Sequence, residues 1–177
     1  MQTAANEKDL RYPIGRFEKA NFANLEENIE TIRNLPERLR QAINGLTPEQ
    51  LDLPYRPGGW SFRQTIHHLA DSHLQSFGRI KTAITSSSPP VICPYDEAKF
   101  AELADYDSDI EPSLQILEGL HLRWVRLLES LNDEQHEKKF RHPETGDWTI
   151  REVIGLYAWH SLHHTAHITE ARRLGGF

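Results

Sequence analysis

Histidines gather in two short segments of this chain. Seven of its ten histidines fall in the patterns H-H-x-x-x-x-H at 67–73 and H-x-x-H-H-x-x-H at 160–167. In a helix, residues four positions apart lie one turn above each other, so such a pair can direct two imidazoles at one ion about 2.1 Å from each nitrogen. Neutral imidazole is a good ligand for zinc, nickel, copper and iron. The two segments therefore indicate a transition-metal site.

The second segment holds two pairs with this spacing, His160 with His164 and His163 with His167. At about 100° per residue, the apolar residues of this segment lie on the same side of a helix as His160 and His164. We expect this pair to point into the protein, where a shared metal would satisfy both rings. His163 and His167 fall toward the edge of the apolar stripe, where we expect solvent contact or a supporting role beside the metal.

A third ligand has to come from another helix, because two ligands on one helix leave a metal site incomplete. The segment at 67–73 is the natural source. Its helical wheel places His73 near the centre of the apolar stripe and His68 well away from it, so periodicity alone favours His73. For the isolated His121 and His142 we expect hydrogen-bonded packing roles rather than metal binding.

The elements that must carry these histidines are long helices. Apolar residues at three- and four-residue steps predict helices at 24–44, 62–85, 109–131 and 150–175, with a short helix at 97–103. No segment shows a convincing strand alternation. We therefore predict an all-α four-helix bundle with short extra helices, organised as a single domain over residues 1–177.

Local signals mark the ends of these helices. Pro36 should kink or split the first helix. The patterns S-x-x-Q at 61–64 and T-x-x-E at 149–152 predict capping boxes at the starts of the second and last helices. Asp109 is the expected N-cap of the third helix. Gly175 and Gly176 should end the last one, because glycine readily adopts the left-handed conformation.

The composition argues against several classes of binding partner. With 20 Lys and Arg against 26 Asp and Glu, the net charge is −6, which disfavours nucleic acids and anionic membranes as partners. The single cysteine, Cys93, cannot form an internal disulfide. The N-terminal stretch MQTAANEKDLRYP lacks the features of a secretory signal, and no stretch approaches the ~20 apolar residues of a membrane-spanning helix. We expect a cytoplasmic protein.

Four longer strings resemble one known family. YPIGRF at 12–17, PYRPGGWSFRQTIHHLADSH at 54–73, CPYDE at 93–97 and LYAWHSLHHTAHITE at 156–170 resemble the DinB-like superfamily of metal-binding helical bundles. The resemblance is greater to its YfiT branch, described as metal-dependent hydrolases and including bacillithiol S-transferases. It implies a bundle of the up-down-down-up type and a homodimer.

The resemblance also implies a ligand set. In the family, one metal-binding histidine lies in W-[ST]-x-R-x-x-x-H-H-L-A-D and two lie in a final H-x-x-x-H. The second of the paired histidines corresponds to His68, and the final two correspond to His160 and His164. On this basis we expect His68 rather than His73 as the third ligand. His67, Asp71 and His73 then become candidates for groups that orient the ligands.

Three functions are consistent with such a site, which would hold one divalent zinc or nickel ion per chain and leave a coordination position open. The first is hydrolysis of a small-molecule substrate by metal-activated water. The second is S-transfer, in which a low-molecular-weight thiol such as bacillithiol is activated. The third is a non-catalytic metal-binding or stress protein. Ser161 follows His160, so the H-E-x-x-H pattern of metalloproteases is absent. We expect the four tryptophans to be core residues; Trp60 is the best exception, a candidate for substrate contact, because it precedes the first histidine-bearing helix.

Overall fold

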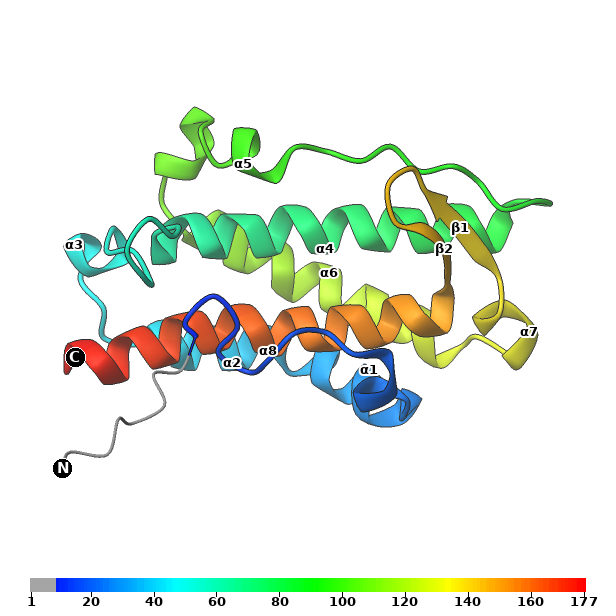
Figure 1. The fold of residues 1–177 in the computed structure, drawn as a ribbon, viewed down its shortest axis with the longest axis horizontal. Coiled ribbons are helices and arrows are strands. Elements are labelled where there is room, and N and C mark those ends of the chain that lie inside the picture. Colours follow the sequence, from blue (N-terminus) through cyan, green and yellow to red (C-terminus); the bar gives the residue numbers. More distant parts are fainter. Residues whose placement is uncertain (1–8) are drawn as a thin grey trace, which may run out of the picture.

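Four helical segments run alongside one another in the computed structural model, which describes residues 9–177 (Figure 1). The first segment is α1 (Leu25–Arg33) followed by α2 (Leu35–Ile43), and the others are α4 (Phe62–Thr85), α6 (Glu111–Glu129) and α8 (Ile150–Gly175). In Figure 1, α4 and α6 run in the same direction, opposite to α1, α2 and α8. The long connection at 86–110 returns the chain to the other end of the bundle. The up-down-down-up arrangement is therefore confirmed.

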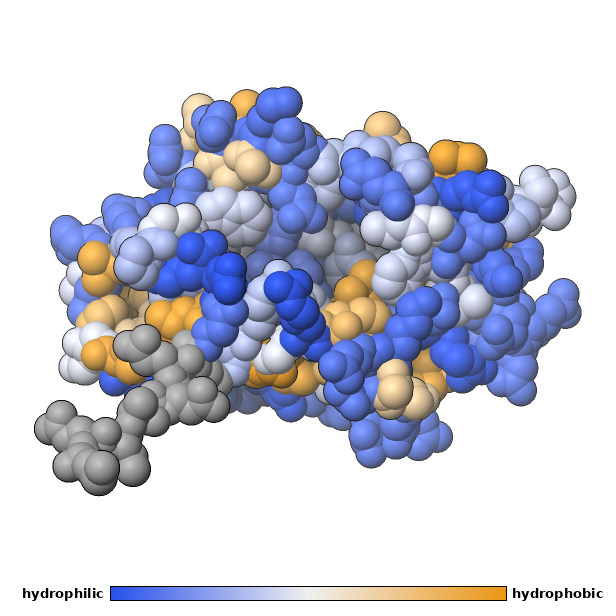
Figure 2. Space-filling model, in the orientation of Figure 1, coloured by the Kyte–Doolittle hydropathy of each residue, from blue (hydrophilic) through white to orange (hydrophobic). Residues whose placement is uncertain are grey.

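Residues 1–8 lie outside the described residues. They make up most of the N-terminal stretch at 1–13, for which we predicted no secretory signal. Within residues 9–177, no helix combines the length and apolar character needed to cross a membrane. The face shown in Figure 2 is mostly hydrophilic, with apolar side chains in scattered patches.

Within residues 9–177, five short helices accompany the long ones; the first precedes α1 and the others lie in the connections. They are η1 (Lys19–Phe22), α3 (Pro48–Leu51), α5 (Glu97–Phe100), η2 (Ala104–Asp107) and α7 (Asp133–His136). The short helix expected at 97–103 corresponds to α5. We did not predict α3 and α7, although each begins with a capping box that the sequence displays, Thr47 with Gln50 and Asn132 with Gln135.

One prediction about secondary structure was wrong. A two-stranded antiparallel hairpin, β1 (Lys139–His142) with β2 (Gly146–Thr149), precedes α8. Its strands have four residues each, too few for an alternating pattern to stand out in the sequence. Gly146 has a φ of +83°, a conformation that glycine adopts without steric cost at this turn. The hairpin leads directly into the N-cap of α8 and so helps to set where that helix begins.

The predicted capping boxes are both present. The Ser61 hydroxyl accepts from the backbone N–H of Gln64 at 3.1 Å, and the Gln64 side chain accepts from the backbone N–H of Ser61 at 3.0 Å. Thr149 and Glu152 make the same reciprocal pair at the start of α8. Both histidine-bearing helices therefore begin with the same capping motif. At the far end of α8, Gly176 adopts the predicted left-handed conformation.

The starts of the two remaining segments follow the prediction less closely. Asp109 was the expected N-cap of α6, but Ile110 occupies that position, and the Asp109 carboxylate accepts from the backbone N–H of Glu111. Pro36 splits the first helix as expected: α1 ends at Arg33, and α2 begins at Leu35 with the proline in its first turn, where its missing N–H costs no helical hydrogen bond.

The apolar core forms two clusters. One lies toward the hairpin end and includes Phe77, Trp124 and Ile154, and the other lies toward α3 and includes Phe62 and Leu117. On α8 the histidines at 160–167 lie between residues of the two clusters, and on α4 His73 does, whereas His67 and His68 lie among residues of the cluster toward α3. Apolar packing therefore holds these two helices together at the level of the histidines.

Candidate metal centre

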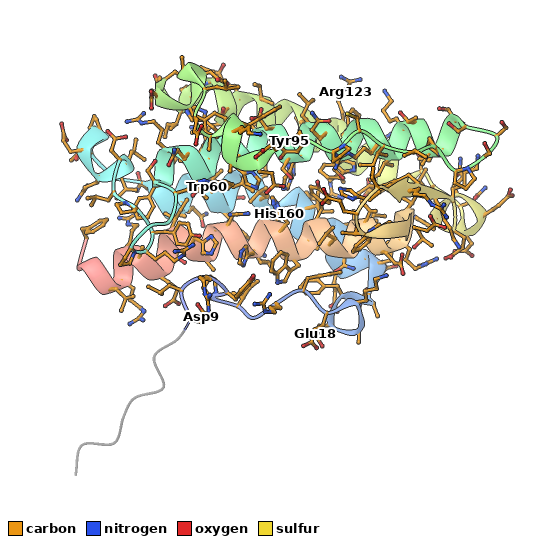
Figure 3. The ribbon with its side chains drawn as sticks, turned by 45° about the horizontal axis from the view of Figure 1, so that its top comes forward. Asp9, Glu18, Trp60, Tyr95, Arg123 and His160 are labelled. Carbon is orange, nitrogen blue, oxygen red and sulfur yellow. The ribbon has the colours of Figure 1, made fainter. Side chains whose placement is uncertain are left out.

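Three histidines from two helices converge in the middle of the bundle. His68 comes from α4, and His160 and His164 come one turn apart from α8. Nε2 of His68 lies 3.2 Å from Nε2 of His160, and one nitrogen of each of the three rings lies within 4.8 Å of the others. In Figure 3, His160 projects from α8 toward α4, with Trp60 nearby. The structure thus brings together the three residues that the family resemblance selected.

This geometry fits a transition-metal ion. Two nitrogens that each lie about 2.1 Å from a tetrahedral zinc ion are separated by roughly 3.4 Å, close to the observed separation between His68 and His160. The donors are all imidazole nitrogens, which suit zinc and nickel. Small movements of the rings would therefore be enough to place three nitrogens around one ion.

Burial keeps these rings neutral. His68 and His164 are buried, whereas His160 is partly exposed. Desolvation lowers the pKa of His68 to about 4 and lowers the pKa of His160 and of His164 well below the ordinary value. A neutral imidazole retains the lone pair that a metal ion requires.

His73 lies beside this group, in contact with one of its members. It is fully buried, and its Nε2 lies 3.1 Å from Nδ1 of His160. The helical wheel was right to place His73 in the core, but α4 is buried on a second face as well. On that face the ring of Trp60 packs on His68 with centroids 4.7 Å apart, and α8 covers the remainder of the His68 side chain. A wheel that assumes one buried face cannot identify such a residue.

The other two candidates for orienting groups contact different parts of the protein. Nδ1 of His67 lies 2.8 Å from the Ser113 hydroxyl. The Asp71 carboxylate accepts a hydrogen bond of 2.7 Å from the Tyr106 hydroxyl, while burial raises the pKa of this carboxyl group. Their hydrogen bonds thus connect α4 to the segment at 106–113. Of the three candidates, the structure places His73 against a member of the site.

Of the two alternatives for His163 and His167, solvent contact was wrong, and a supporting role beside the metal stays a prediction. Both are buried, because the N-terminal segment and the loop before α4 cover this side of α8. Trp159 stacks on His163, and Tyr55 stacks on His167 with ring centroids 3.9 Å apart. Together with His164, these two histidines also form a group whose ligand atoms lie within 4.8 Å of one another. A helical wheel carries no information about what loops cover, so the sequence could not show this.

A cavity of about 330 Å³ opens beside His164. Its lining comes from the N-terminal segment, the loop before α4, and α8, and consists of Arg11, Tyr12, Tyr55, Arg56, Gly58, Gly59, Trp60, His163, His164 and His167. Of the residues that the structure describes, two arginines and no acidic residue line it. It is therefore a locally basic pocket in a protein with a net charge of −6.

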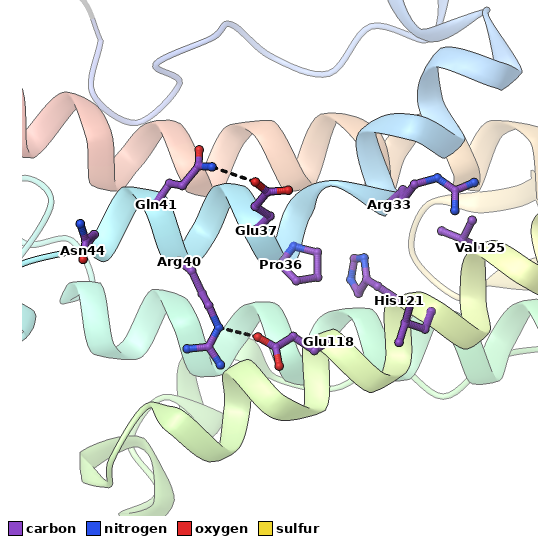
Figure 4. Close-up of a pocket in the computed structure, with 10 residues that line it drawn as sticks. Arg33, Pro36, Glu37, Arg40, Gln41, Asn44, Glu118, His121 and Val125 are labelled. Carbon is purple, nitrogen blue, oxygen red and sulfur yellow. Dashed lines mark hydrogen bonds and ion pairs between the residues drawn. The ribbon is translucent and has the colours of Figure 1, made fainter.

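Another cavity lies across the bundle, between α2 and α6 (Figure 4). Arg40 and Glu118 form an ion pair across it, and His121 points from α6 toward Pro36. None of the three converging histidines lines this cavity. The basic pocket beside His164 is therefore the better candidate for a substrate cavity.

Comparisons with known proteins agree with this description. The sequence pattern of the DinB superfamily matches residues 31–168. A protein of Bacillus cereus (strain 03BB102) named "Putative metal-dependent hydrolase" is 52% identical over 169 residues, which cover 93% of this chain and 96% of that protein. A Bacillus anthracis (strain A0248) protein of the same name is 51% identical with the same coverage.

Two solved structures share the fold. One is described as "YfiT from Bacillus subtilis is a probable metal-dependent hydrolase with an unusual four-helix bundle topology"; it superposes with a TM-score of 0.88 at 43% identity, over 95% of this chain and 98% of that chain. The other, "TT2238, a four-helix bundle protein", has a TM-score of 0.54 at 16% identity, over 87% of this chain and 100% of that chain, and shows the fold alone.

Fold and site together define the class: a four-helix bundle in which three histidines from two helices form a candidate metal centre. The chain belongs to the DinB superfamily, and within it to the YfiT-like proteins whose members carry the name metal-dependent hydrolase.

Proposed function

We propose that this protein is a hydrolase of small molecules that depends on one zinc or nickel ion held by His68, His160 and His164. The observation that carries the proposal is the convergence of three neutral imidazoles, of which that of His164 also lines a cavity. Three protein ligands leave a coordination position for water or substrate. A divalent ion held there would supply Lewis acidity and lower the pKa of bound water.

The surrounding residues support a small and acidic substrate. The cavity beside His164 has room for a small molecule, and Arg11 and Arg56 line it. Arg11 is already paired with Asp9 at 3.0 Å, whereas the Arg56 guanidinium donates to the backbone oxygen of Pro57 at 3.0 Å. Among the described residues Arg56 has no carboxylate partner, and such an arginine is suited to a substrate carboxylate or phosphate. We therefore assign to Arg56 the role of orienting an acidic group of the substrate.

The same cavity favours one alternative, S-transfer with a low-molecular-weight thiol such as bacillithiol. A thiol loses its proton readily next to a metal ion, and acidic groups on its scaffold would face the same arginine. In both functions, His68, His160 and His164 hold the ion, and Trp60 shields the ring of His68. The two functions differ in the nucleophile, so an assay with and without a thiol separates them.

The first experiment is elemental analysis of the purified protein and three variants, with helicity checked by circular dichroism. We expect about one ion per chain in the wild type, and loss of that ion in His68→Ala and His164→Ala. The matched control is His142→Ala, in the hairpin, which should keep the ion. A folded wild type that binds no zinc or nickel after reconstitution would overturn the proposal.

The metal-loaded protein is then assayed against esters and amides, and against a thiol together with an electrophile. Product formed without thiol supports hydrolysis, and product that requires thiol supports S-transfer. Metal binding with no product in either assay would instead support a non-catalytic metal-binding or stress protein.

A further inference from the structure

Four groups form a continuous line of hydrogen bonds that begins at the candidate metal centre and ends on the backbone. Nδ1 of His160 lies 3.1 Å from Nε2 of His73, and Nδ1 of His73 lies 3.0 Å from Nε2 of His121. Nδ1 of His121 lies 2.6 Å from the carbonyl oxygen of Ile32. The line crosses the bundle from α8 through α4 and α6 to α1.

The carbonyl of Ile32, at the end of the line, determines which atom donates and which accepts in every hydrogen bond. A carbonyl oxygen can only accept, so Nδ1 of His121 carries a proton and donates it to Ile32. A neutral imidazole has one N–H, so Nε2 of His121 accepts from Nδ1 of His73. By the same argument, Nε2 of His73 accepts from Nδ1 of His160. The remaining nitrogen, Nε2 of His160, is left with a lone pair, and it is the atom that faces Nε2 of His68.

The carbonyl of Ile32 is available because of a proline. In an α-helix the oxygen of residue 32 would accept from the N–H of residue 36, but Pro36 has no N–H. The break between α1 and α2 therefore leaves this oxygen without its usual helical donor, with only the cap N–H of Asn34 directed at it among the described backbone groups, and it can accept from His121. Figure 4 shows the His121 ring directed at this junction.

Packing holds the two intermediate rings in place. His73 is fully buried and His121 nearly so. Trp124 and Tyr157 both meet the His73 ring edge-on, with centroids 5.5 and 5.0 Å away. Burial also lowers the pKa of His121 to about 4, so its ring is neutral near pH 7. The donor and acceptor roles along these hydrogen bonds cannot be exchanged, because the carbonyl oxygen of Ile32 has no proton to donate.

The geometry points to His73 and His121 as positioning residues that, together with the Ile32 carbonyl, select the tautomer of His160 in which Nε2 is free to bind metal. The inference rests on the proposed metal site. His160 differs from the other two proposed ligands because its Nδ1 has a hydrogen-bond partner, His73. The Nδ1 atoms of His68 and His164 are buried without a hydrogen-bond partner among the described residues. A hydrogen bond from the distal N–H of a ligating imidazole fixes its orientation and raises its basicity.

The tautomers are tested in the metal-free protein, so this measurement does not depend on the proposed function. Two-bond 1H–15N spectra of the histidine-labelled chain distinguish Nδ1–H from Nε2–H rings, and resonances are assigned with single-histidine variants. We expect Nδ1–H tautomers for His73 and His121. An Nε2–H tautomer at either residue would overturn the inference, even if the protein binds metal.

The link to the metal is tested by zinc affinity, measured by competition with a chromophoric chelator. His121→Phe removes the acceptor for His73 and should weaken zinc binding about 10- to 100-fold. His121→Gln can donate to Ile32 and accept from His73, and should recover most of that loss. A purely structural role would instead make both variants equally weak or leave both unchanged, and either outcome would overturn the inference.

The matched control is His136→Phe, which replaces a buried histidine of α7 that has no part in the line. Its zinc affinity should equal that of the wild type. Equal losses in His136→Phe and His121→Phe would show that the effect reports general destabilisation, and this result would also overturn the inference.

Discussion

The indole of Trp60 packs on the imidazole of His68, with ring centroids 4.7 Å apart and the ring planes inclined by 49°. Trp60 lies in the loop directly before α4, and its contact closes the face of α4 that carries His68. The buried state of His68 therefore depends on a residue outside its own helix.

Trp60→Ala should weaken zinc binding by about tenfold, because the His68 ring would gain freedom and contact with water. Chelator competition measures the affinity. Trp148→Ala is the matched control: this tryptophan packs against Phe17 and Lys19 near the hairpin, and its loss should leave zinc affinity unchanged. Equal affinity in Trp60→Ala and the wild type would show that the indole does not support the ligand.

Arg56→Gln should reduce the preference for acidic substrates, because the glutamine side chain keeps hydrogen-bonding capacity but loses the charge. Matched substrate pairs that differ only in a carboxylate or its neutral amide provide the measurement. We expect kcat/KM for the acidic member to fall about tenfold and that for the neutral member to change little. Arg123→Gln, on α6 and outside the cavity lining, is the control. A parallel fall for both members of the pair would argue against the assigned role.

The metal-free protein should lose stability as the pH falls below neutrality. The folded pKa of His121 is about 4, below the ordinary value of 6.5, because burial disfavours the charged ring. The unfolded chain thus binds the proton first, so this contribution is complete above pH 6.5 and decreases as the pH falls toward 4. One such group changes the free energy of unfolding by at most about 1.4 kcal/mol per pH unit.

Urea unfolding at several pH values checks this slope. Between pH 6.5 and 4, the free energy of unfolding should depend less steeply on pH in His121→Gln than in the wild type. The difference should correspond to the binding of one proton fewer on unfolding. An unchanged slope in the variant would mean that His121 is not the neutral buried ring that its environment indicates.

Leu117→Ala should lower the free energy of unfolding by about 2–5 kcal/mol, since this fully buried side chain of α6 belongs to the core cluster toward α3. Leu122→Ala, on the same helix, changes a side chain that is 77% exposed and should alter stability by less than about 0.5 kcal/mol. Chemical denaturation of both variants gives the comparison. Similar losses in the two would contradict the assigned orientation of α6.

The predicted homodimer, the zinc or nickel identity of the metal and the choice between hydrolysis and S-transfer stay predictions. The stoichiometry and assay experiments above address the metal and the chemistry. Analytical ultracentrifugation of the metal-loaded protein addresses the dimer.

The sequence by itself determined the features that depend on neighbouring residues. Helical periodicity and capping boxes at Ser61 and Thr149 were enough to locate α4 and α8, because a helix start depends on atoms three residues apart. Pro36 was enough to split the first helix, because the missing N–H is a property of that residue alone. The spacing of His160 and His164 likewise placed two imidazoles on one face of α8.

Tertiary structure decided which faces are buried and which groups meet. A wheel of α4 predicted one apolar face, but α6 and Trp124 cover the side of His73 while α8 and Trp60 cover the side of His68. The N-terminal segment buries His163 and His167 in the same way. The hydrogen bond from His121 to Ile32 spans 89 positions in the sequence. Such contacts depend on the packing of whole helices, and no local pattern of residues encodes them.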